Sequence, residues 1–100
     1  MVYKKFKDYK LEIIKMLFIR KDPAEVLKEI EKLDTSNSIT LSQVQQLTDM
    51  VFNGEIYKIL RPANMSQALA LRLKYDQQIF VYKGRIIASY YADTGTAVLE

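Results

Sequence analysis

The sequence contains neither cysteine nor histidine. Without cysteine the chain can form no disulfide, no thiolate zinc site and no thiol nucleophile, which fits a reducing compartment. Without histidine it lacks the usual general base near neutral pH and the commonest metal ligand in proteins. Any chemistry would rest on Asp, Glu, Lys or Tyr, so we expect no enzyme activity, no cofactor and no metal site.

Long apolar runs and glycine-rich loops are also missing. The longest unbroken apolar run is the four residues Met16–Ile19, whereas a helix that crosses a bilayer needs about 20 apolar residues. The three glycines, at positions 54, 84 and 95, are too scattered to form a phosphate-binding loop. The acids cluster on one helix or stand singly, with no EF-hand pattern. We therefore expect a cytoplasmic protein without a membrane segment.

What the chain does have is enough apolar material for one core. Its 100 residues are 49% apolar and 27% charged, close to the averages of globular proteins. Two separate cores of half this length would be too small to be stable without disulfides or metals. We therefore expect one domain over residues 1–100.

Apolar spacing and capping residues predict four helices. Asp22-Pro23 is typical of a helix start, and Thr40 with Gln43 three residues later forms a capping box. Asn64 or Ser66 can cap the last helix, and Asn53-Gly54 is typical of the end of the third. The expected helices cover residues 3–20, 23–33, 41–52 and 65–76.

The second half of the chain predicts a β-hairpin. Strands over 79–82 and 85–91 are joined by Lys83-Gly84, a two-residue turn. Residues 55–60 fit either a strand or a helical turn, and the tail at 93–96 is turn-like and expected to fray. Together these elements predict an α+β fold with three to four helices packed on a small antiparallel sheet that includes this C-terminal hairpin.

Strand alternation divides the hairpin into two faces. A pairing of Tyr82 with Arg85 puts one set of apolar side chains on the expected core face and a second set on the expected outer face. The core set is Ile79, Val81, Ile86, Ala88 and Tyr90; the outer set is Phe80, Tyr82, Arg85, Ile87, Ser89 and Tyr91.

The net charge of +3 is unevenly distributed. Residues 1–21 carry a net charge of +5, residues 22–50 carry −4, and residues 51–100 carry +2. A basic helix followed by an acidic one favours charge pairing within the fold. The alternative is that the basic stretch binds phosphate.

The apolar surplus favours a regulatory or adaptor domain that works by protein contact, with a partner or with a second copy. Phe80, Ile87 and Tyr91 on the expected outer face, with Phe18 of the first helix, exceed what one small core needs to bury. If helices covered both faces of the sheet, the same side chains would lie inside the monomer.

The alternative function is nucleic-acid binding of winged-helix type. The helix over 64–76 would enter a groove, and the hairpin tip would touch the backbone. About eleven residues separate this helix from the preceding one, which departs from the three- to four-residue turn of a helix-turn-helix. The expected contacts are Arg72, Lys74, Lys83, Arg85, Lys4 and Lys5.

Overall fold

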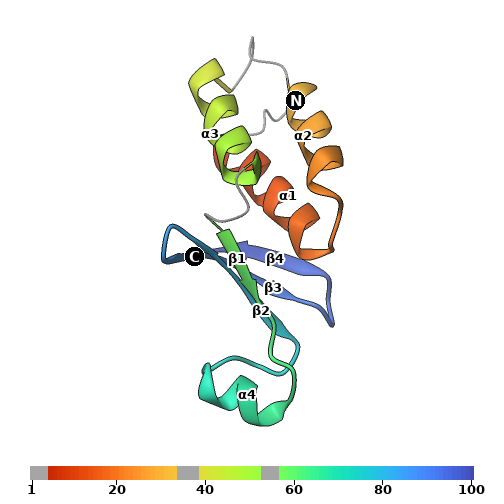
Figure 1. Ribbon diagram of the computed structural model, residues 1–100, viewed down its shortest axis with the longest axis vertical. Coiled ribbons are helices and arrows are strands. Elements are labelled where there is room, and N and C mark those ends of the chain that lie inside the picture. The colour runs from red at the N-terminus through yellow and green to blue at the C-terminus, as the bar shows by residue number, and fades with distance from the viewer. Residues whose placement is uncertain (1–4, 34–38, 53–56) are drawn as a thin grey trace.

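The computed structural model describes residues 5–33, 39–52 and 57–100. It shows an α+β fold with a four-stranded antiparallel sheet, so the expected fold class is confirmed (Figure 1). In chain order the elements are α1 (Phe6–Phe18), α2 (Pro23–Glu31), α3 (Leu41–Phe52), β1 (Tyr57–Leu60), α4 (Met65–Ala70), β2 (Gln77–Tyr82), β3 (Arg85–Tyr91) and β4 (Thr96–Leu99).

The helices begin where polar side chains satisfy the first free N–H groups. Asp22 accepts a hydrogen bond from the Ala24 N–H at 2.9 Å. Gln43 N–H donates to Thr40 Oγ1 at 3.2 Å while Thr40 N–H donates to Gln43 Oε1 at 3.0 Å, which confirms the expected capping box. Asn64 caps α4, since its side chain accepts from the Gln67 N–H at 2.8 Å.

Two helix ends differ from expectation. The first helix begins at Phe6, because Lys5 is extended and its N–H donates to Asp8 Oδ2 at 2.9 Å. The second ends at Glu31, not at Leu33. The expected end signal at Asn53-Gly54 lies outside the described residues.

The expectation that the last helix extends to Asp76 is wrong, because α4 ends at Ala70. Arg72 adopts a left-handed conformation with φ of 58°, and the Leu73 N–H bonds back to the Ala68 carbonyl at 2.8 Å. This is a Schellman motif, which closes a helix and turns the chain away. The same motif closes α1, with Arg20 at φ 64° and the Lys21 N–H on the Met16 carbonyl at 3.0 Å.

The sheet is an antiparallel meander in the order β1-β2-β3-β4. Lys83 and Gly84 both have positive φ, 51° and 77°, as a two-residue hairpin turn requires. Residues 57–60 form a strand, which settles the open alternative for this segment. The tail does not fray after the turn, because Thr96–Leu99 pairs with β3 as the fourth strand.

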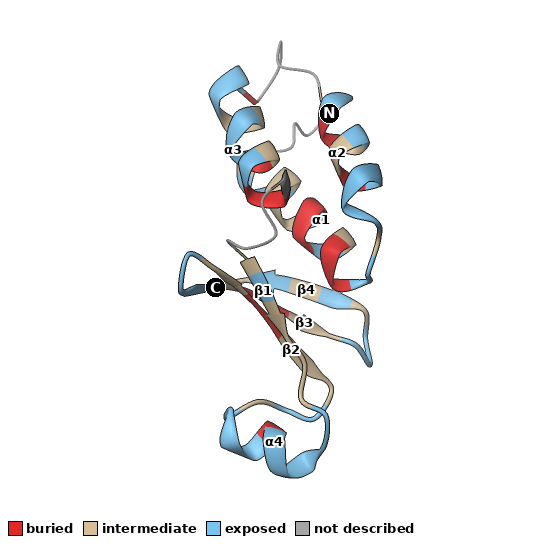
Figure 2. Cartoon of the chain, in the orientation of Figure 1, coloured by how far each residue is buried: buried red, intermediate tan, exposed pale blue. Residues whose placement is uncertain are grey.

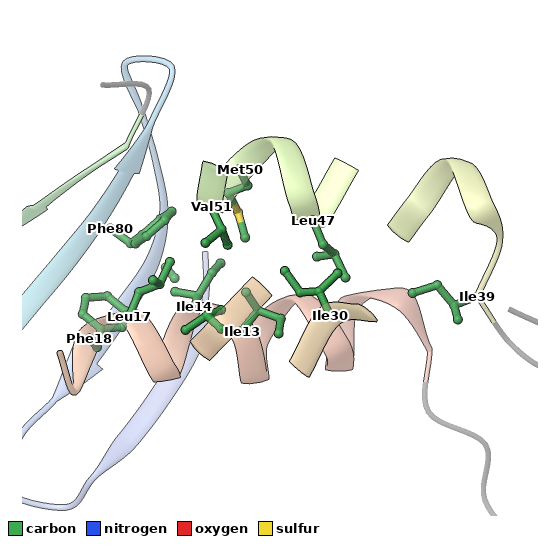
Figure 3. Packing of buried hydrophobic residues seen from close by; sticks show 12 residues of the cluster. Ile13, Ile14, Leu17, Phe18, Ile30, Ile39, Leu47, Met50, Val51 and Phe80 are labelled. Atoms are coloured by element: carbon green, nitrogen blue, oxygen red, sulfur yellow. The ribbon is translucent and has the colours of Figure 1, made fainter. Parts of the chain in front are cut away.

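The three long helices all lie on one side of the sheet, with α1 between the sheet and the α2–α3 pair (Figure 1). Figure 3 shows the core running from Phe80 and Phe18 at the sheet to Ile30 and Ile39 among the helices. Phe18 contacts the rings of both Phe80 and Tyr90, at centroid distances of 6.0 and 5.3 Å. The helix α4 lies away from this core beyond one end of the sheet, and Figure 2 shows most of it exposed.

Candidate functional site

The sheet has one covered face and one face that no long helix covers. Paired residues of neighbouring strands share a face, so the register assigns each side chain. Phe80 pairs with Ala88 on the face beneath α1, which we call the helix face. The opposite face, which we call the open face, carries the paired residues Ile79 and Ser89, Val81 and Ile86, and Ser89 and Val98.

A β-bulge in the hairpin reverses the face assignment expected from strand alternation. Tyr82 pairs with Arg85 as expected, but Val81 pairs with Ile86 and Phe80 with Ala88, so β3 has one extra residue at Ile87. An inserted residue shifts every later side chain to the other face. The expected core set was therefore wrong in part, because Ile86 lies on the opposite face from Ala88.

Exposed aliphatic side chains surround the open face. Ile86 is 55% exposed, Val98 is 45% exposed and Leu71, just after α4, is 40% exposed, whereas Ile79 beneath them is only 7% exposed. Together they border a shallow hollow of about 340 Å³. Its lining comes from the segment after α4 and from three strands: Leu71, Arg72, Leu73, Gln77, Ile79, Ile86 and Ser89, with Glu100 at the end of the chain.

The floor of this hollow contains a buried polar group. Ser89 is 1% exposed, and its hydroxyl donates to the Glu100 carboxylate while it accepts from Gln77 Nε2 at 3.3 Å. Because both hydrogen-bonding capacities of the hydroxyl are used, Ser89 is not available as a nucleophile in this arrangement. The hollow is thus an apolar rim around a satisfied polar centre.

Charges are separated along the open face and its borders. Lys58 pairs with Val81 near the hairpin turn, where Lys83 and Arg85 are also exposed. Asp76 and Asp93 flank the paired residues Gln77 and Tyr91 at the other end of the sheet. Beside them, Lys74 Nζ lies 5.8 Å from the centroid of the Tyr91 ring.

The structure does not place the four expected interface residues on one exposed surface. Phe80 and Phe18 are buried, at 0% and 2% exposure, and Ile87 is half-buried against the core. Tyr91 is half-buried and lies on the open face, since it pairs with Gln77. The expected outer face of the hairpin is thus largely the helix face, and Phe80 and Phe18 are corrected to core residues.

The expected nucleic-acid contacts are exposed but divided. Arg72 and Lys74 follow α4 near the start of β2, whereas Lys83 and Arg85 lie at the hairpin turn beyond its end. The six residues of β2 separate the two groups by about 20 Å. Lys5 is exposed before α1, and Lys4 lies outside the described residues.

Sequence reasoning missed three residues of the open face, Leu71, Ile86 and Val98. Leu71 was assigned to a helix that ends earlier, and Val98 belongs to a strand that the short tail did not suggest. No local signal marks the bulge that exposes Ile86. The alternation of residues 96–99 between threonine and aliphatic side chains was the available hint of β4.

Positive groups on the helix side are positioned by local structure. Arg61 Nη2 donates to the Phe18 carbonyl at the end of α1, at 3.2 Å. Burial lowers the pKa of the Arg61 guanidinium, and the neighbouring charge of Arg20 lowers it further. Arg61 thereby compensates the carbonyl end of α1, which is a structural role.

Comparisons with protein-family models, with curated proteins and with solved structures found no match. Within residues 5–33, 39–52 and 57–100, no three acids come together in a way that could hold a metal ion. In the same ranges no helix has the length and apolarity needed to cross a bilayer. The open face is therefore the candidate site.

Proposed function

We propose that this chain is a non-catalytic regulatory or adaptor domain that acts by protein contact through its open face. The observation that carries the proposal is the exposure of Leu71, Ile86 and Val98 around one hollow, on the sheet face opposite the helices. An antiparallel sheet with one covered face normally presents polar side chains to water on the other. Clustered aliphatic side chains there are typical of a surface that another protein covers.

The physical gain comes from burial of this aliphatic rim. Removal of apolar surface from water contributes about 25 cal/mol per Å². The rim side chains are already held by the sheet and by the turn after α4, so little conformational freedom remains to be lost on contact. The polar floor at Ser89 is satisfied within the chain and adds no unpaired group when it is covered.

A substitution at the rim tests this function. Immobilised wild-type protein should retain a specific protein that the Ile86→Glu variant loses, because the new carboxylate would be buried without a partner. The matched control is Leu41→Glu, since Leu41 is 75% exposed at the start of α3, away from the sheet. Retained proteins are identified by mass spectrometry and tested again in purified form. If retention is equal for both variants, contact through the open face is refuted.

A second candidate function rests on the exposed cations Lys58, Lys83 and Arg85 at the hairpin end of the sheet. We propose sequence-tolerant nucleic-acid binding there as the alternative, because clustered cations neutralise phosphates. A gel-shift series with rising salt tests it: binding should weaken steeply with salt, and Lys83→Glu should weaken it further. Absence of a shift at low salt would exclude this alternative.

A further inference from the structure

We propose that the occupant of the open face is a second copy of this chain, packed face to face about a two-fold axis. The inference rests on the proposed function, because it names the partner of the same surface. It predicts a symmetric dimer in which each copy covers the aliphatic rim of the other. The helices α1, α2 and α3 would then lie on the two outer sides of the dimer.

The charge balance of the open face favours a second copy over a strongly charged partner. Three cations and three acids lie on or around this face, whereas the rest of the chain carries the whole excess of +3. A surface of mixed sign is complementary to itself when a two-fold axis brings opposite charges together. The cations are Lys58, Arg72 and Lys74; the acids are Asp76, Asp93 and Glu100.

The order of these charges along the strands sets the orientation. Lys58 lies near the hairpin turn with Lys83 and Arg85, whereas Asp76 and Asp93 lie at the opposite end of the sheet. If the second copy were turned end for end, the basic end of each copy would lie over the acidic end of the other. A parallel arrangement would instead place like charges together, which is unfavourable.

The apolar residues fit the same arrangement. Val81 and Ile86 are neighbours near the hairpin turn, Ile79 lies mid-sheet, and Val98 borders Ser89 on the adjacent strand. Two sheets that pack face to face lie about 10 Å apart, with side chains of both filling the gap. The rim around the hollow of one copy would therefore receive the rim residues of the other.

The first test is the molar mass of the purified full chain, measured by light scattering and sedimentation equilibrium over a wide range of concentration. The wild type should rise from the 11.7 kDa of a monomer towards twice that mass. Ile86→Glu should weaken association about tenfold or more, because a buried carboxylate without a partner costs at least the ~1.4 kcal/mol of a tenfold change. Val98→Glu should act in the same direction, and Leu41→Glu should leave association unchanged.

The second test is a charge exchange. Lys58→Glu and Asp93→Lys should each weaken the dimer about two- to fivefold, as expected for exposed pairs. The double variant should return towards wild-type affinity, because the exchanged charges meet again across the axis. Failure of the double variant to recover would refute the end-for-end orientation.

The outcomes separate this inference from the proposed function. A chain that stays monomeric at all concentrations would overturn the second copy as occupant. Retention of a different protein that depends on Ile86 would still support contact through the open face. Circular dichroism of every variant shows whether it is folded, and a dimer that Ile86→Glu and Val98→Glu leave intact would also overturn the inference.

Discussion

The two faces of the sheet use similar side chains but reach different states. On the helix face, Phe80 is fully buried between the rings of Phe18 and Tyr57. On the open face, Ile86 is 55% exposed although it belongs to the same hairpin. The difference shows that coverage by α1, and not the apolarity of a strand residue, determines which face forms the core.

The largest expected effect is the loss of Phe80. Phe80→Ala should lower the free energy of unfolding by about 3–5 kcal/mol, because it leaves a cavity between two aromatic rings. Ile86→Ala should change it by no more than about 0.5 kcal/mol in the monomer, since an exposed side chain loses little. Urea denaturation at low protein concentration measures both. Equal effects would contradict the contrast between the faces.

An intermediate effect is expected at the floor of the open face. Ser89→Ala should lower the free energy of unfolding by about 1–2 kcal/mol, because it removes the hydroxyl that joins Gln77 and Glu100. Part of the loss is recovered, since the Glu100 carboxylate is exposed and can be hydrated. Ser42→Ala serves as a control at an exposed serine of α3. If the two substitutions cost the same, the buried network contributes nothing.

The smallest expected effects are gains. Arg72→Gly should stabilise the fold by about 0.5–1 kcal/mol, because glycine adopts positive φ without steric cost. Arg20→Gly should gain somewhat more, because it also removes the repulsion that helps lower the pKa of Arg61. Thermal unfolding of both variants at one concentration compares them. Destabilisation by either would show that the arginine side chain makes a needed contact.

Much of the local structure could be predicted from short-range signals. Asp22-Pro23, Thr40 with Gln43, and Lys83-Gly84 each determine their turn or cap by hydrogen bonds or by φ preference within a few residues. The structure confirms all three. Such features need no information from the rest of the fold.

The candidate site could not be predicted in the same way. The exposure of Ile86 depends on the bulge at Ile87, and that of Val98 on a strand of four residues that is held by pairing with β3. Leu71 reaches the hollow only because Arg72 ends α4 early. Each depends on contacts between segments far apart in the chain.

The sequence alone determined the fold class, the helix starts and the hairpin turn, because capping and turn formation are local. Only the tertiary structure decided which hairpin residues face the helices, since one inserted residue reverses the alternation of a strand. It also decided that the apolar surplus gathers around Ile86, Val98 and Leu71, because all three long helices pack on the opposite side of the sheet.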